Sequence, residues 1–248
     1  GGQIQLMFDT PLSLVPQARA MAAAEAMLRR TASGSAQAES GTVRLAASEV
    51  VSVEILPAIL AEFAQSFPRI RIELAVSNRN EDLLQHDADV AVRMMRPVQG
   101  AVVAVSLGTV RLGLYAHRRY AARQGLPDSV AALRDHVLIG PESLDRLAGV
   151  TLGDLPVQPD LFTLRSDNDL AQLALLRAGL GIGICQAGIA ARDQDLVPVL
   201  PKAAGFSIPA WLAMHEDQRA NRPVRLLYAH LNQSLGQLWR KGGHQPEL

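Results

Sequence analysis

Residues 41–76, GTVRLAASEVVSVEILPAILAEFAQSFPRIRIELAV, constrain the fold of this chain more than any other segment. Apolar residues alternate with polar or small ones at 43–47 and again at 70–76, which predicts two strands. Between them, apolar residues recur at helical spacing from Ile55 to Phe67, with Pro57 near the start of the helix and Pro68 at its end. Two strands joined through a helix form a βαβ unit, so the segment predicts an α/β fold with a mostly parallel sheet.

The same alternation continues along the rest of the chain. Hydrophobic residues make up 48% and charged residues 19% of the 248 residues, which suits one large domain or two lobes with separate cores. Further strands are expected at 89–93, 102–105, 111–116, 138–139, 181–185 and 211–214, and helices at 81–86, 118–123, 130–133, 169–178, 186–191 and 224–238.

The segment before residue 41 has a different composition. Residues 16–30 are rich in alanine, open with a proline and close with two arginines, as is typical of a helix whose last turn faces the negative end of its dipole. The helix has few large apolar residues, so we expect it to pack against a partner. Residues 31–41 are small and polar, which indicates a flexible linker.

Charge and cysteine content exclude several classes of protein. The formal net charge is zero and the pI is about 7.2, which argues against a nucleic-acid-binding surface on this chain, because phosphate contacts need clustered basic residues. Cys185 is the one cysteine, so no internal disulfide is possible. No signal peptide or membrane span is evident, and the default expectation is a cytoplasmic protein without membrane contact.

Neither a catalytic nor a metal-binding arrangement is evident. The six histidines are scattered, without the HxH or HExxH spacing of a metal site. The glycines at 179, 181 and 183 follow a helix and precede a β-like run, the reverse of the order in a phosphate-binding loop, so Gly179 is expected to end the helix. We therefore expect no enzyme, no cofactor and no metal. Cys185 is expected to be a buried thiol, and the pairs Asp87/Asp89 and Asp193/Asp195 to be solvated loop charges.

The order of several motifs resembles the LysR-type transcriptional regulators over roughly residues 11 to 240. The motifs are the alanine-rich helix, GTVRLAASE with LPAILAEFAQSFPRIRIEL, HDADVAVRM, LGLYAHRRY and SDNDLAQLALLRAGLGIGIC. The resemblance implies two Rossmann-like lobes resembling type 2 periplasmic binding proteins, with an inducer cleft between them. It also implies a linker helix used in dimerisation, and hence a homodimer or homotetramer through this helix and the lobes. The family's winged helix-turn-helix is not visible, except that 5–14 could be a remnant of its wing, so DNA binding is implied through a domain missing from this chain.

These expectations divide the chain into three parts. Residues 1–40 hold the wing remnant, the linker helix and the linker. Residues 41–112 and 213–248 form the first effector-binding lobe, and 113–212 form the second. The chain is expected to leave the first lobe in a strand near Arg111–Tyr115 and to return in a strand near Trp211–His215, with the two lobes holding separate sheets.

The first candidate ligand residues, Ser48, Glu49 and Val50, lie where the first strand meets its helix. A hydroxyl beside the unpaired N–H groups of a helix start can bind an anion, and the resemblance implies that a hydroxyl here holds the inducer carboxylate. Alternatively, Ser48 or Ser52 simply caps the helix. The Glu49 carboxylate would repel an anion unless it turns outward, which leaves a neutral or cationic effector open.

Two further candidates follow the next strands. Asn78, like Asn80, could donate a hydrogen bond to a ligand, although asparagines are also common in polar turns. Arg93 ends the third strand and could bind a carboxylate through two hydrogen bonds, which we favour over the same role for Arg96. The alternative for Arg93 is a solvated surface charge.

In the second lobe, the candidates are Ser166 and Asn168. Arg165 to Asp169 have the form of a helix cap, with Ser166 and Asp169 spaced as in a capping box. The ligand role of Ser166 and Asn168 is implied by the resemblance. The sequence thus predicts the effector-sensing and oligomerisation region of a LysR-type regulator, which binds a small polar ligand, anionic by family habit. The alternative is a free-standing solute-binding protein of the same fold.

Overall fold

The computed structural model describes residues 21, 22, 24, 25, 39–76, 88–97, 102–147, 152, 155 and 157–241. The candidate Asn78, with Asn80 and the helix expected at 81–86, lies outside the described residues, and so do the wing remnant and most of the linker helix. The four described residues of that helix, at 21, 22, 24 and 25, are helical.

Two compact units make up the chain. The chain passes from unit 1 to unit 2 between Ser106 and Leu107, and it returns between Ala210 and Trp211. The boundaries expected from the sequence, after 112 and after 212, lie a few residues further along the chain. Unit 2 also takes in the described residues from Gln237 to Lys241, which the sequence assigned to the first lobe.

Unit 1 is built on a parallel core of three strands. β1 (Gly41–Ala47) pairs with β2 (Ile70–Val76) on one side and with β3 (Val90–Arg93) on the other, both in parallel. β9 (Gly205–His215) runs antiparallel to β3, with Val90 opposite Met214. Val43, Leu45 and Ala47 of β1 are fully buried, which is what their alternation predicted.

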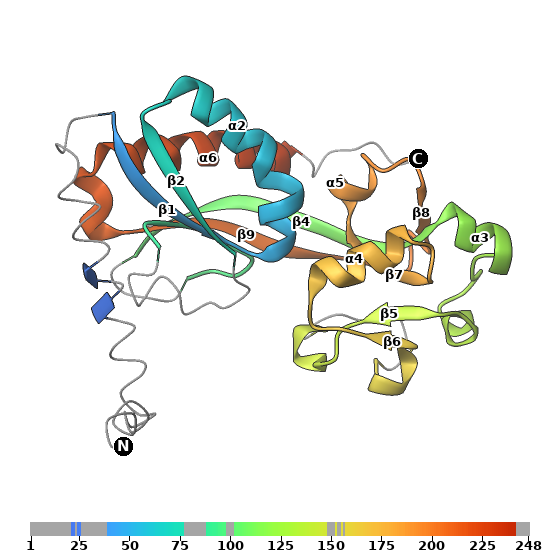
Figure 1. Cartoon of the computed structure of the whole chain (residues 1–248). Helices are drawn as coiled ribbons and strands as arrows, with labels where there is room; N and C mark the ends of the chain where they lie inside the picture. Colours follow the sequence, from blue (N-terminus) through green and yellow to red (C-terminus); the bar gives the residue numbers. More distant parts are fainter. Residues whose placement is uncertain are drawn as a thin grey trace, which may run out of the picture. The chain divides into compact units, whose positions relative to one another are not determined.

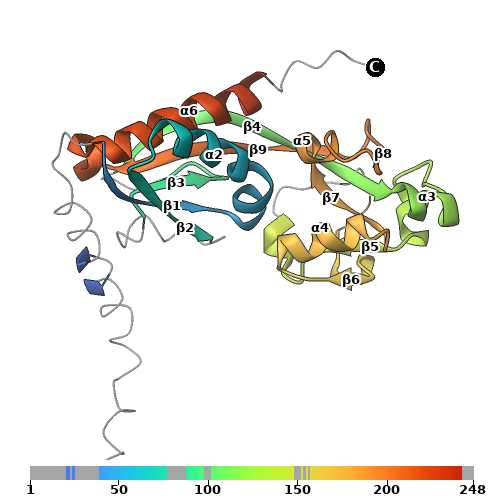
Figure 2. The same cartoon turned by 45° about the horizontal axis from the view of Figure 1, so that its top comes forward.

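Two helices cover one face of the unit 1 sheet, as Figures 1 and 2 show: α2 (Leu56–Ser66) and α6 (Arg222–Lys241). α6 buries Leu227, Leu231 and Leu235 completely, a spacing that places all three on one side of the helix. The His230 ring nitrogen Nε2 lies 3.0 Å from the Ile59 carbonyl oxygen and joins the two helices.

A π-helical turn (Val51–Ile55) precedes α2, and Pro57 explains it. Helical backbone begins at Glu49, so Pro57 lies inside a helix rather than at its start. A proline ring clashes with the carbonyl four residues earlier and offers no N–H to it. The helical turn just before the proline is therefore wider than an α-helical turn: the Leu56 N–H donates to the Val51 carbonyl five residues earlier instead of four.

Unit 2 is a mixed sheet around β4 (Val102–His117), which enters from unit 1. β7 (Ile182–Gln186) and β8 (Leu196–Val199) pair with β4 in antiparallel fashion. β5 (Leu138–Gly140) lies parallel to both β7 and β6 (Leu164–Arg165). The expectation of separate strands at 102–105 and 111–116 was wrong, because β4 runs through both.

Short helices connect the strands of unit 2: α3 (Arg118–Gln124), α4 (Asp169–Arg177) and α5 (Ala187–Ala190). The helix expected at 130–133 is a 3₁₀ turn, Ala131–Asp135, and further 3₁₀ turns span Leu144–Leu147, Pro159–Leu161 and, in unit 1, Glu216–Ala220. α4 packs on β5 and β7. Gly179 has a φ of +75° just after α4, which confirms that it ends this helix.

Hydrogen-bonded pairing continues from one unit to the other. Among the described residues, nine strands form one sheet in the order β2-β1-β3-β9-β4-β7-β5-β6, with β8 paired to β4. The expectation of two separate sheets was wrong, because the neighbours β4 and β9 each cross a unit boundary as a strand. These two strands also run antiparallel to their partners β7, β8 and β3, so the sheet is mixed rather than mostly parallel. Within the described part, no helix combines the length and apolarity of a membrane span.

Candidate functional site

The turn after β1 joins a buried strand end to the first turn of a helix. The Ser52 N–H donates to the Ser48 carbonyl over 2.8 Å, the first hydrogen bond of this helix. Glu49, Val50 and Val51 lie before that bond, in the turn whose N–H groups have no acceptor within the helix. Together with the positive end of the helix dipole, such groups favour an anion or another hydrogen-bond acceptor.

The two serines of this turn differ in their surroundings. Ser52 is buried, with 3% of its surface exposed, and its hydroxyl donates to the Ala47 carbonyl at the end of β1 over 3.3 Å. Ser48 is half-buried, and within the described part of the chain its hydroxyl has no hydrogen-bond partner. Ser52 thus holds the strand end to the helix, a role that the sequence analysis did not assign. Glu49 is half-buried and interacts with other parts of the chain.

Two charged residues near β3 are buried, which for Asp89 contradicts the expectation of a solvated loop charge. Arg93 is 5% exposed and lies opposite Trp211 of β9, so the alternative of a solvated surface charge is wrong for this residue. Arg96 is exposed, with its guanidinium 5.4 Å from the centre of the Trp211 ring. Asp89 is 3% exposed, and its Oδ2 accepts from the Arg44 N–H over 2.8 Å. The position of Asp89 inside the apolar run ADVAV was a signal of burial.

Ser166 and Asn168 lie at the start of α4 in unit 2. The helix cap is Asn168, whose Oδ1 accepts from the Ala171 N–H over 2.7 Å. Ser166 does not form the expected capping box with Asp169: its hydroxyl oxygen accepts from the Asn168 N–H over 3.2 Å. The physical reason is that the helix begins at Asp169, so Ser166 lies too early to cap it.

These bonds decide what the two side chains can offer a ligand. The amide oxygen of Asn168 is used by the helix, which leaves its NH₂ group as a donor. The Ser166 hydroxyl oxygen likewise receives one bond and keeps its own hydrogen as a donor. This turn therefore suits a ligand that carries hydrogen-bond acceptors.

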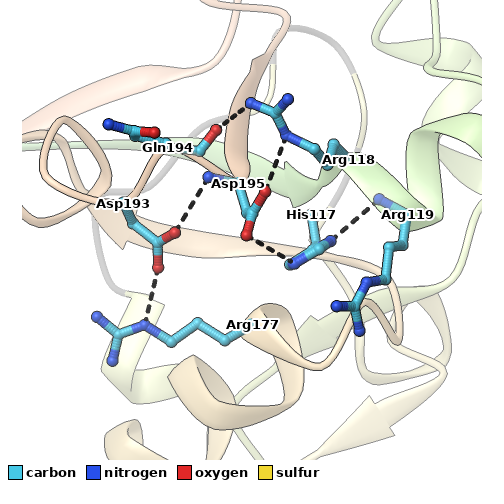
Figure 3. Close-up of polar contacts among 7 residues, drawn as sticks. All are labelled: His117, Arg118, Arg119, Arg177, Asp193, Gln194 and Asp195. Carbon is cyan, nitrogen blue, oxygen red and sulfur yellow. Dashed lines mark hydrogen bonds and ion pairs between the residues drawn. The ribbon is translucent and has the colours of Figure 1, made fainter.

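A polar network at another place in unit 2 is structural (Figure 3). Asp195 accepts from Arg118 Nε over 3.0 Å and lies 3.9 Å from His117 Nε2, while Asp193 accepts from Arg177 Nε over 3.1 Å. Both aspartates were expected to be solvated loop charges: Asp195 is exposed, as expected, whereas Asp193 is half-buried, and each also pairs with an arginine. His117 Nδ1 accepts from the Arg119 N–H and caps α3.

Further titratable groups are buried or half-buried in the sheet and on α6. Cys185 is 4% exposed and its thiol lies 3.5 Å from the Gln186 carbonyl oxygen, as expected for a buried thiol. The pKa of the Tyr115 phenol is raised, mainly by burial and to a lesser extent by the neighbouring Cys185, while the positive charge of Arg111 lowers it in part. Burial also raises the pKa of Tyr228. Among the described residues, no group of acidic, histidine and cysteine side chains could hold a metal ion.

Comparison of the amino-acid sequence with known proteins identifies a family and several relatives. A family model described as the LysR substrate binding domain matches residues 36–236. An HTH-type transcriptional repressor of Pseudomonas aeruginosa is 27% identical over 184 residues, which are 71% of this chain and 58% of that protein. The HTH-type transcriptional regulator CrgA of Neisseria meningitidis is 25% identical over 205 residues, which are 79% of this chain and 68% of that protein. The chain thus spans only part of the length of these curated relatives.

The fold has a counterpart among solved structures. The regulatory domain of CrgA from Neisseria meningitidis superimposes with a TM-score of 0.72 at 21% identity, covering 79% of this chain and 99% of that domain. The chain therefore has the α/β fold of LysR regulatory domains, with two lobes resembling type 2 periplasmic binding proteins, as the sequence predicted. Because the family model covers most of its length, the chain belongs to the LysR substrate-binding domain family.

Proposed function

We propose that this chain is the effector-sensing and oligomerisation region of a LysR-type transcriptional regulator, and that it binds a small polar ligand rich in hydrogen-bond acceptors. Membership of the family supports the general role. The observation that carries the ligand class is the cap of α4. There the side-chain oxygens of Asn168 and Ser166 accept hydrogen bonds from backbone N–H groups, so the Asn168 NH₂ group and the Ser166 hydroxyl hydrogen remain as donors for a ligand.

A carboxylate is the ligand group that best matches these donors. In unit 1, the Ser48 hydroxyl and the Val50 N–H, beside Glu49, offer donors for such a group, and in unit 2 Ser166 and Asn168 offer donors of the same kind. The carboxylate of Glu49 acts against an anion here. A ligand that carries an amino group beside its carboxylate would be attracted by the negative charge of Glu49 as well as by the donors.

Arg93 and Asn78 complete the proposed ligand set. The buried guanidinium of Arg93 has lost most of its contact with water, so a carboxylate in its reach would be bound more strongly than at a solvated arginine. Asn78 keeps its proposed role from the sequence. No catalytic residue and no cofactor is part of this proposal.

The proposed macromolecular partners are a second copy of the chain and DNA. The helix at 16–30 and the lobes would join copies into a dimer or tetramer. In this proposal a helix-turn-helix domain binds DNA, and the protein acts in the cytoplasm. The ligand can shift DNA binding only by its difference in affinity between two states, typically about 1–3 kcal/mol.

A thermal-shift screen with Ser48→Ala tests the ligand site. The screen uses small carboxylates, aromatic acids, amino acids and cationic amines. A binding compound at 100 times its dissociation constant should stabilise the protein by about 2.7 kcal/mol. Ser48→Ala should weaken the carboxylate that binds best by about fivefold, because one hydrogen bond of about 1 kcal/mol is lost.

Ser129→Ala is the matched control, since Ser129 is an exposed serine of unit 2 just before the turn Ala131–Asp135 and is not one of the proposed ligand residues. It should bind as the unmodified chain does. If Ser48→Ala binds as tightly as Ser129→Ala, the assignment of Ser48 is wrong. If only the cationic amines bind, Glu49 rather than the donors determines the ligand class.

A further inference from the structure

Asp167 lies between the two proposed ligand residues of unit 2 and contacts a different loop. Its Oδ1 accepts from the backbone N–H groups of Glu142 and Ser143, each over 2.9 Å. These two residues follow Pro141 in the loop after β5, which ends at Gly140. One carboxylate oxygen therefore joins residues 142–143 to the start of α4.

This contact extends the strand pairing beyond its last backbone hydrogen bond. β5 and β6 are parallel with Gly140 opposite Arg165, and the Ser166 N–H donates to the Gly140 carbonyl over 3.0 Å. Beyond that bond the two chains leave the sheet, and the Asp167 side chain forms the next link. On the other side, Gln172 Nε2 donates to the Ser166 carbonyl over 2.6 Å. The backbone that carries Ser166 is thus held from both directions.

An acidic residue near a helix start also has an ordinary explanation. A negative charge close to the N-terminus of α4 stabilises the helix through its dipole, whatever the direction of its side chain. That effect needs the charge of Asp167 and not its two hydrogen bonds. Asparagine in the same place has no charge but keeps a carbonyl oxygen that can accept both N–H groups. The two explanations therefore predict different results for Asp167→Asn.

We propose that Asp167 is a positioning residue of the ligand site: by binding the N–H groups of Glu142 and Ser143, it holds the loop after β5 against the α4 cap. The donors of Ser166 and Asn168 then keep a fixed direction toward the ligand. This inference rests on the proposed function of those two residues. Asp167 does not contact the ligand in this proposal; it acts on affinity through its neighbours.

The first measurement is ligand-free and follows amide hydrogen exchange at Glu142 and Ser143 by NMR. In Asp167→Ala both amides should exchange about fivefold faster or more, because each loses a hydrogen bond of about 1 kcal/mol. Asp167→Asn should keep exchange close to that of the unmodified chain. Asp160→Asn, at an exposed aspartate in the turn Pro159–Leu161, is the control for charge removal. Unchanged exchange in Asp167→Ala would overturn the proposal.

The second measurement titrates the same variants with sodium succinate and sodium benzoate by calorimetry. Asp167→Ala should weaken the binding acid about fivefold, with a urea midpoint close to that of Asp160→Asn, and Asp167→Asn should restore the affinity. Equal weakening in Asp167→Asn and Asp167→Ala would assign a charge effect instead. If neither acid binds the unmodified chain, the proposed carboxylate site fails and the ligand role of Asp167 fails with it, whereas the exchange data report on the loop contact separately.

Discussion

Asp89 shows how a single residue in unit 1 depends on its surroundings. A buried carboxylate is costly unless hydrogen bonds compensate for lost water. Asp89 accepts from the Arg44 N–H at its Oδ2, and its own N–H donates to the Arg44 carbonyl over 2.9 Å, so the residue pairs with β1 just before β3 begins. The aspartate thereby joins the start of β3 to the middle of β1. Because Leu45 lies opposite Val90 in this parallel pair, the carboxyl ends of both strands, after Ala47 and Arg93, lie at the same edge of the sheet.

Tyr228 provides a prediction about pH at the same scale. Burial raises the pKa of its phenol above the ordinary value of 10.0, and its hydroxyl donates to the Leu212 carbonyl over 3.4 Å. The folded protein keeps this proton at a pH where the unfolded chain has released it. The stability from this group is therefore complete below the unfolded pKa and is lost as the pH rises through the folded pKa.

Urea unfolding between about pH 8 and pH 11 measures this effect. The free energy of unfolding should fall above about pH 10, and the fall should be smaller in Tyr228→Phe. Loss of the hydrogen bond to Leu212 should add a cost of about 1 kcal/mol that does not vary with pH at neutral values. Parallel curves for Tyr228→Phe and the unmodified chain would contradict the prediction.

At the scale of elements, β4 is a single strand because Gly108 allows it to continue. The sequence analysis expected two strands, at 102–105 and 111–116, with residues 106–110 outside both. Gly108 instead has a φ of +112°, a value that residues with a Cβ rarely adopt. It also lies against the backbone of α6: a Cβ here would be 2.7 Å from the carbonyl carbon and oxygen of Trp239. β4 and the end of α6 can approach this closely only at a glycine.

Gly108→Ala should therefore destabilise the protein by about 3 kcal/mol or more, from backbone strain and from a clash with backbone atoms that cannot move aside. Urea unfolding of two controls separates the causes. Gly125→Ala shares a positive φ, +73°, but has open space around its Cβ, and it should cost about 1 kcal/mol. Gly188→Ala in α5 has open space and no positive φ, and it should be neutral or slightly stabilising. A loss in Gly108→Ala no larger than that in Gly125→Ala would show that the contact with Trp239 does not matter.

For the whole molecule, the proposed self-association depends on the N-terminal helix. Met21 is helical and 74% exposed, a large apolar side chain of the kind that an interface between copies would cover. Sedimentation velocity at increasing protein concentration should show association of the unmodified chain. Met21→Glu should raise the dissociation constant about tenfold or more, because a charge would be buried at the interface. Met95→Glu, which changes an exposed methionine in unit 1, should leave the dissociation constant of self-association unchanged. A monomer at every concentration would contradict the proposed oligomer.

The sequence by itself determined the local elements and the family of this protein. Alternating apolar residues in 43–47 and 70–76 and the helical spacing between them predicted β1, β2 and α2, because side-chain periodicity follows directly from backbone geometry. Ser48 and the cap of α4 could also be located, since each lies where a strand or loop meets a helix. Local patterns are sufficient for such features.

Only the tertiary structure decided what depends on contacts between distant residues. Asp89 is buried by its pairing with Arg44, and the Ser166 hydroxyl oxygen accepts from the Asn168 N–H instead of forming the expected capping box with Asp169. β4 continues through residues 106–110, which were expected to lie between two strands, because a neighbouring helix and a glycine fit each other there. Burial, hydrogen-bond partners and strand continuity depend on what lies beside a residue in space, and a linear pattern of residue types does not contain that information.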